Sequence, residues 1–185
     1  MAQRVYVVPI GEPPAEIVQT VVLRLAGLFS HVAVAQTVVP LGDAFDPVRR
    51  QCDSTRLLET LGREPPARGD RVIGVTDRDL FIPILTFVFG EAQLGGETAI
   101  VSLYRLRNEF YGLPPDPAAA IDRLVKECLH ELGHTFGLVH CEDYGCVMHG
   151  STSVEEIDLK GAKYCVQCAG RAAPWLDAAA WDQSL

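Results

Sequence analysis

The sequence has neither a long apolar run nor an excess of positive charge. None of its apolar stretches reaches the roughly 18 residues that a membrane-spanning helix needs. The N-terminal apolar run is too short, and too soon interrupted, for a signal peptide, so we expect a cytoplasmic protein. The chain has 16 Lys and Arg but 24 Asp and Glu, a formal net charge of −8. This balance argues against nucleic acid or an anionic membrane as main partner, because both would repel the negatively charged chain.

Internal repeats and low-complexity segments are also missing. The 185 residues suit one domain with a sizeable core. Hydrophobic residues make up 48% and charged residues 22%, which is ordinary for a folded globular protein and argues against general disorder.

The order of the predicted elements indicates an α/β fold. Residues 4–10, 32–39 and 71–76 are β-branched runs typical of strands, and residues 15–29 carry apolar side chains at helical spacing. A strand, a helix and a strand in close succession favour a crossover on a parallel sheet.

The middle of the chain predicts one helix and two more strands. Residues 45–61 mix polar and apolar side chains in a pattern that favours a helix. Strands are expected over residues 87–89 and 99–103, with Gly95-Gly96 in the turn between them. The strand near Phe87 is a candidate for the edge of the sheet.

The longest predicted helix runs from residue 118 to about residue 138. Asp116 is a plausible N-cap, and Pro117 suits the first helical position. Its apolar face comprises Ile121, Leu124, Val125, Cys128, Leu129 and Leu132.

The end of this helix reads HELGHTFGLVH. His130 and His134 are four residues apart, so both imidazoles project from one helix face and can bind one zinc ion. Glu131 can reach a water on that metal as a general base. Gly137 allows a sharp helix end, after which the chain can bring His140 to the third position. Three imidazoles leave a fourth position open, as a catalytic site requires. The alternative, a structural histidine cluster, does not explain this spacing.

Four of the six cysteines lie in the last quarter of the chain. Two pairs at these spacings fit a four-thiolate zinc site, formed by Cys141, Cys146, Cys165 and Cys168. Two disulfides, or a redox-active CxxC pair, are the alternatives. Of the remaining cysteines, Cys128 on the apolar helix face is expected to be a small buried hydrophobe, and Cys52 has no assigned role.

The histidine motif is the HExxHxxGxxH signature of the metzincin clan of zinc peptidases. Met148 matches the methionine that these enzymes place in a turn beneath the metal. Together with Cys141 directly after the third histidine and the later CxxC, the segment from His130 to Cys168 resembles the archaemetzincin family. Some metzincins add a tyrosine ligand two residues after this methionine, where this chain has Gly150. His149 is expected at the surface, with substrate contact as the alternative.

The resemblance implies a single metzincin-like domain spanning residues 1–185, of the α/β (α+β) class. It implies a twisted mixed β-sheet with one antiparallel edge strand, against which an extended peptide would pair near residues 87–93. Residues 1–117 would form the sheet-rich part, residues 118–140 the active-site helix and third ligand, and residues 141–170 the Met-turn and a zinc-stapled segment. Two zinc ions per chain are implied, one catalytic and one structural.

The implied function is zinc-dependent hydrolysis of peptide bonds, with Glu131 as the general base and a peptide as the substrate. The family resemblance suggests an aminopeptidase on short peptides. Such an enzyme needs acidic groups for the substrate's amino terminus, and Glu97, Glu127 and Glu142 are candidates. The alternatives are a zinc-binding peptide-recognition or regulatory protein without activity, and a zinc hydrolase of non-peptide amides.

Overall fold

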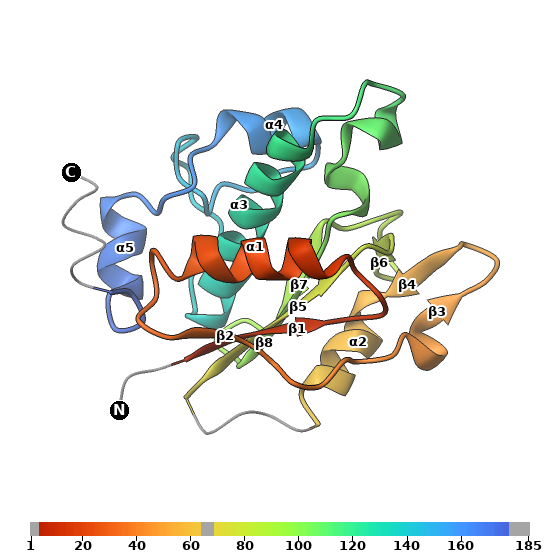
Figure 1. Cartoon of the computed structure of the whole chain (residues 1–185). Coiled ribbons are helices and arrows are strands. Elements are labelled where there is room, and N and C mark those ends of the chain that lie inside the picture. Colours follow the sequence, from red (N-terminus) through yellow and green to blue (C-terminus); the bar gives the residue numbers. More distant parts are fainter. Residues whose placement is uncertain (1–3, 64–68, 178–185) are drawn as a thin grey trace.

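The computed structural model describes residues 4–63 and 69–177, and its main feature is a five-stranded mixed sheet (Figure 1). The strand order is β2-β1-β5-β8-β7. These strands are β1 Val5–Pro9, β2 Val32–Val34, β5 Arg71–Thr76, β7 Gly90–Ala92 and β8 Thr98–Ser102. All neighbours pair in parallel except β7, which is antiparallel to β8. The expected mixed sheet with one antiparallel edge strand is therefore confirmed.

Five α-helices and three short 3-10 helices accompany the sheets in the described part of the chain. The α-helices are α1 Ala15–Leu25, α2 Ser54–Leu61, α3 Pro117–Thr135, α4 Val154–Leu159 and α5 Val166–Ala172. The 3-10 helices are η1 Gly42–Ala44, η2 Tyr104–Leu106 and η3 Asn108–Tyr111.

The two faces of the main sheet bury different sets of side chains because residues alternate along each strand. In β5, Ile73 and Val75 join the larger core, which α1 and α3 cover, whereas Val72 joins a second core beneath α2. In β8, Val101 joins the larger core and Ile100 joins the second core. Figure 1 shows α1 and α3 on one side of the sheet and α2 on the other. The sheet is thus the middle of three layers.

The helix predicted over residues 45–61 is wrong in its first half. A small sheet occupies that region, with strands β3 Phe45–Asp46, β4 Gln51–Asp53 and β6 Leu80–Phe81. The Asp46 carboxylate accepts hydrogen bonds from the backbone N–H groups of Val48 and Arg49, at 2.8 and 3.0 Å, and so closes a tight turn. Arg50 follows with a φ of 58°. The hydrogen bonds of the Asp46 side chain and the pairing of β4 with β6 therefore outweigh the helical pattern.

Smaller differences concern element boundaries. The second strand ends at Val34 rather than at residue 39, where a single bridge joins Val39 to Ile10. The strand predicted over residues 87–89 begins three residues later, as β7. In the tail, Trp175 stacks on Phe136 with ring centroids 4.9 Å apart, whereas Trp181 lies outside the described residues.

Within residues 4–63 and 69–177, no helix is both long enough and apolar enough to cross a membrane.

The packing of α1 on the sheet generates a stability prediction with a control in the same helix. Leu25 is fully buried, whereas Leu23 is 74% exposed. Leu25→Ala is expected to lower the free energy of unfolding by about 2–5 kcal/mol, because it leaves a cavity under α1. Leu23→Ala is expected to change it by less than about 0.5 kcal/mol. Urea unfolding of both variants measures the difference, and equal midpoints would contradict the layer arrangement.

Candidate active site

Helix α3 carries the first half of the site. The Asp116 carboxylate accepts a hydrogen bond from the backbone N–H of Ala119 at 3.0 Å, and Pro117 is the first helical residue, so the helix begins as predicted. From there α3 packs against β8 and the edge strand β7. This contact brings His130, Glu131 and His134 to the edge of the sheet.

The end of α3 turns the chain back toward the side of the helix that carries His130 and His134. The helix ends at Thr135, three residues before the predicted boundary, and Gly137 has a φ of 83°. The backbone N–H of Leu138 donates to the Gly133 carbonyl at 3.0 Å, as in a Schellman C-cap. The left-handed backbone that the motif requires is available to glycine at little steric cost. His140 is thereby returned beside the helix.

The three histidines meet at one point. Their ligand nitrogen atoms all lie within 4.8 Å of one another, on His130, His134 and His140. The Nε2 atoms of His130 and His134 are 3.1 Å apart. Two nitrogens of a tetrahedral zinc ion, each at about 2.1 Å, would be about 3.4 Å apart. The histidine cluster therefore has the dimensions of a zinc site.

Backbone carbonyls set the orientation of two of these rings. His130 Nδ1 lies 2.8 Å from the Val147 carbonyl, and His134 Nδ1 lies 2.8 Å from the Leu138 carbonyl. A carbonyl can only accept, so each Nδ1 carries the proton and each Nε2 keeps its lone pair for a metal. Burial lowers the pKa of His130 and of His134, which also favours the neutral ligand form.

Glu131 is a buried carboxylate beside the histidines. Its residue is 6% exposed. Burial raises its pKa, as does the charge of Glu127, while Lys160 lowers it. A raised pKa makes this carboxylate a better proton acceptor.

A glycine in the edge strand makes room for Glu131. A Cβ atom at Gly90 would lie 2.7 Å from Glu131 Cγ and 2.7 Å from the Ile100 carbonyl oxygen. Real Cβ atoms do not approach other atoms so closely. Gly90 therefore lets β7 pass directly over the carboxylate.

Met148, the residue that matches the methionine of the metzincin turn, packs against helix α3 at Gly133. It is fully buried, and a Cβ atom at Gly133 would collide with its Sδ atom. Gly150 lies against His140, where a Cβ atom would be 3.2 Å from Nδ1. Gly150, which occupies the position of the tyrosine ligand of some metzincins, is therefore in close contact with the third histidine.

The four late cysteines also converge. The Sγ atoms of Cys141, Cys146, Cys165 and Cys168 all lie within 4.8 Å of one another. Cys141 Sγ and Cys165 Sγ are 3.8 Å apart, which is the spacing of about 3.8 Å expected for thiolates at 2.3 Å from a tetrahedral zinc ion. All six cysteines are free in the described part of the chain, so the structure contains neither of the two alternative disulfides. Cys128 is fully buried in the larger core, as predicted.

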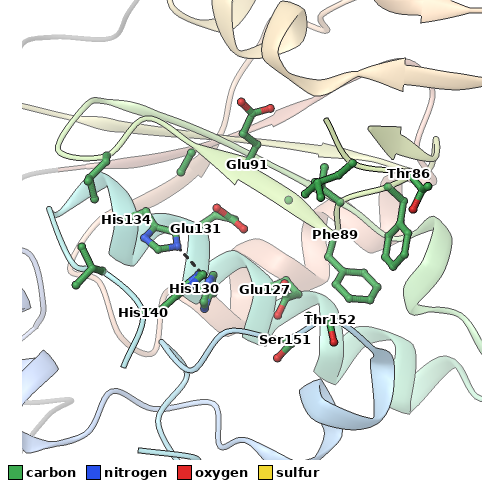
Figure 2. Close-up of a pocket in the computed structure, with 17 residues that line it drawn as sticks. Thr86, Phe89, Glu91, Glu127, His130, Glu131, His134, His140, Ser151 and Thr152 are labelled. Atoms are coloured by element: carbon green, nitrogen blue, oxygen red, sulfur yellow. Dashed lines mark hydrogen bonds between the residues drawn. The ribbon is translucent and has the colours of Figure 1, made fainter. Parts of the chain in front are cut away.

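A cleft of about 650 Å³ runs between α3 and the edge strand (Figure 2). All three histidines and Glu131 line it. Of the three acidic candidates for a substrate amino terminus, only Glu127 lines it, and His149 does not. His149 Nδ1 instead lies 2.9 Å from the Cys141 carbonyl, and its ring contacts Tyr144.

Sequence reasoning missed three residues around the cleft: Gly90, Ser151 and Lys160. Lys160 is 2% exposed and forms an ion pair with Glu127, with 2.9 Å between Nζ and Oε1. No sequence signal singles out these three residues. Lys160 and Gly90 contact Glu127 and Glu131, which are distant from them in the sequence, and only the fold brings Ser151 to the cleft.

Fold, site geometry and family together define the class of protein: a zinc metallopeptidase. The model of Peptidase family M54 matches residues 42–172, a span that holds both the histidine and the cysteine clusters. Curated relatives narrow the identification. An archaemetzincin of Methanocaldococcus jannaschii is 40% identical over 169 residues, covering 91% of this chain and 92% of that protein. The chain belongs to the archaemetzincin family.

Solved structures agree with this assignment. The crystal structure of an archaemetzincin from Methanopyrus kandleri has a TM-score of 0.80 at 37% identity, covering 94% of this chain and 95% of that one. An archaemetzincin from Archaeoglobus fulgidus, solved in complex with malonate, has a TM-score of 0.79 at 33% identity, covering 91% and 99%.

The contact between Gly133 and Met148 predicts a stability effect beneath the metal-binding face. Gly133→Ala inserts a methyl group against Met148 Sδ, so it should lower the free energy of unfolding by about 1–3 kcal/mol despite the better helix propensity of alanine. Gly170→Ala in α5 is the matched control, because a Cβ atom there has no neighbour within 4 Å. Denaturant unfolding compares the two, and a stabilised Gly133→Ala variant would show that Met148 does not pack there.

Proposed function

We propose that the chain hydrolyses peptide bonds in this cleft, with His130, His134 and His140 as the ligands of a catalytic zinc ion and Glu131 as the general base. The observation that carries the proposal is the convergence of three imidazoles, two of them oriented by backbone carbonyls, beside a buried carboxylate. A metal site with a purely structural role needs no base at its side and no open cleft.

Each residue of the site has a defined task. When bound, zinc supplies the positive charge that polarises a scissile carbonyl and lowers the pKa of a water. Glu131 accepts the proton from the attacking water and passes it to the leaving amine. Gly90 leaves room for that carboxylate against β7. The backbone carbonyls of Val147 and Leu138 keep two imidazoles in the tautomer that the metal requires.

The substrate in this proposal is an extended peptide that pairs with the edge strand. β7 pairs with β8 on one side and lies along the cleft on the other. An exposed edge of this kind can add one more strand by main-chain hydrogen bonds. We extend the proposal to aminopeptidase action on short peptides, which product analysis by mass spectrometry tests through the release of single N-terminal residues.

The four cysteines are proposed as the ligands of a second, structural zinc ion. Such a site would stabilise the loop after α3 against the C-terminal segment, because Cys141 and Cys146 precede α4 while Cys165 and Cys168 belong to α5 and its start. Thiolate ligands require reduced cysteines, which supports a location in a reducing compartment such as the cytoplasm.

Replacing the proposed base tests the catalytic assignment. Glu131→Gln is expected to lower kcat/KM for peptides by about 10²–10⁴-fold, because no other group then takes the proton from water. Its zinc content should stay unchanged. Glu142→Gln, an exposed residue outside the cleft, is the control and should keep full activity.

The same assay separates the competing functions. Equal turnover by Glu131→Gln would remove Glu131 from the mechanism. Zinc-loaded wild-type protein that cleaves no member of a peptide library would favour a peptide-recognition or regulatory protein. Hydrolysis confined to small non-peptide amides would favour a zinc hydrolase of non-peptide amides.

Metal analysis tests the second site. The wild-type chain is expected to hold two zinc ions, and Cys165→Ser about one, with a large loss of stability because the loop after α3 is no longer held. Cys128→Ala changes a cysteine outside the cluster and should keep both ions. Two ions in the Cys165→Ser variant would contradict the proposed ligand set.

A further inference from the structure

In the described part of the chain, the carboxylates that line the cleft are not balanced by basic side chains in its lining. Among the described residues, those that line it include three glutamates and neither lysine nor arginine. Two of the three have other tasks. Glu131 is the proposed base, and the Glu91 carboxylate accepts hydrogen bonds from the hydroxyl groups of Ser54 and Thr55. Glu127 is the remaining acidic group.

Glu127 lies on α3 one helical turn before Glu131 and is 4% exposed. Lys160 Nζ lies 2.9 Å from its Oε1 atom and also donates to the His149 carbonyl at 3.2 Å. The Lys160 side chain is 1% exposed and does not line the cleft, so the side of the pair that borders the cleft is the carboxylate. Lys160 occupies Oε1, while Oε2 accepts no hydrogen bond from the described residues, which leaves a buried carboxylate with unused acceptor capacity.

A second polar group beside the cleft is also unsatisfied. Ser151 Oγ is buried without a hydrogen-bond partner among the described residues, and Ser151 lines the same cleft. Figure 2 shows Glu127 and Ser151 together on one side of His130, with His134 on the other side. A buried hydroxyl without a partner is costly, so a ligand that satisfies it would be favoured.

A purely structural role is the simpler alternative for the buried ion pair. Lys160 follows α4, so the pair joins that segment to α3. This role accounts for Lys160, whose ammonium has two partners. It does not account for the position of Glu127 at the cleft surface or for the open acceptors on Glu127 and Ser151.

We propose that Glu127, together with Ser151, binds a cationic N–H group of the peptide substrate next to the scissile bond. This inference rests on the proposed peptidase function and names the class of substrate. Ammonium and guanidinium groups carry three and five N–H donors, which match a carboxylate and a hydroxyl as acceptors. The net charge of −8 would also steer cationic peptides toward the protein. The cation can be a Lys or Arg side chain or a free amino terminus.

Paired peptides distinguish these sources in the zinc-loaded wild-type enzyme. One pair differs only in Lys or norleucine at either residue flanking the scissile bond, and the other only in a free or acetylated amino terminus. The cationic member of at least one pair is expected to have a kcat/KM about 10- to 100-fold higher, the value of a charged hydrogen bond. The pair that shows the difference identifies the source.

Two variants then assign the preference to the proposed residues. Glu127→Gln leaves Lys160 buried without its carboxylate and can misfold, so the double variant Glu127→Gln with Lys160→Gln provides a neutral pair. Both are expected to reduce the preference to about onefold, and Ser151→Ala to weaken it. A structural defect would lower turnover of both peptides equally and leave the ratio unchanged. Glu142→Gln is the matched control.

Peptide binding to zinc-loaded Glu131→Gln, measured by calorimetry, tests the subsite without turnover. The cationic peptide should bind about tenfold more tightly or better, and the added Glu127→Gln change should remove the difference. Equal binding of both members of each pair would overturn the subsite, even if the wild-type enzyme cleaves peptides. Selective binding without any cleavage by the wild type would instead overturn the peptidase proposal and keep the subsite.

Discussion

The close packing of helix α3 between the edge strand and the Met148 turn is the constraint on which the rest of the site depends. Gly133 allows Met148 to lie directly beneath the helix, and Gly90 allows β7 to pass directly over Glu131. A side chain at either position would push the helix away from a neighbour that helps to orient it. The lack of a side chain at Gly90 and at Gly133 therefore allows the close packing that brings the histidines and the glutamate together.

The histidine and cysteine clusters are connected through the backbone as well as through their adjacent residues His140 and Cys141. The Cys141 N–H donates to the Met148 carbonyl at 2.9 Å, and the Val147 carbonyl orients His130. Val147 directly follows Cys146, so the position of that carbonyl depends on the cysteine cluster. A metal bound by the cysteines would hold this loop, and with it one ring of the histidine site, in place. The two clusters behave structurally as one unit.

The metal-binding residues of this protein could be predicted from sequence because they lie close together along the chain. His130 and His134 are one helical turn apart, and the positive φ that Gly137 adopts is a property of glycine itself. The strand at residues 71–76 and the N-terminus of α3 were predictable for the same reason, since pattern and capping act within a few residues. The helix predicted over residues 45–61 failed where pairing with β6, a distant strand, outweighed local preference.

The sequence by itself therefore determined which residues can bind metal, the family and the mixed α/β class. Only the tertiary structure decided that Glu127 borders the cleft while Glu97 and Glu142 do not, and that Lys160 forms an ion pair with Glu127 without lining the cleft. Lys160 lies 33 positions after Glu127, and Gly90 lies 41 before Glu131. Contacts of this kind depend on how helices and strands pack, and no spacing along the chain encodes them.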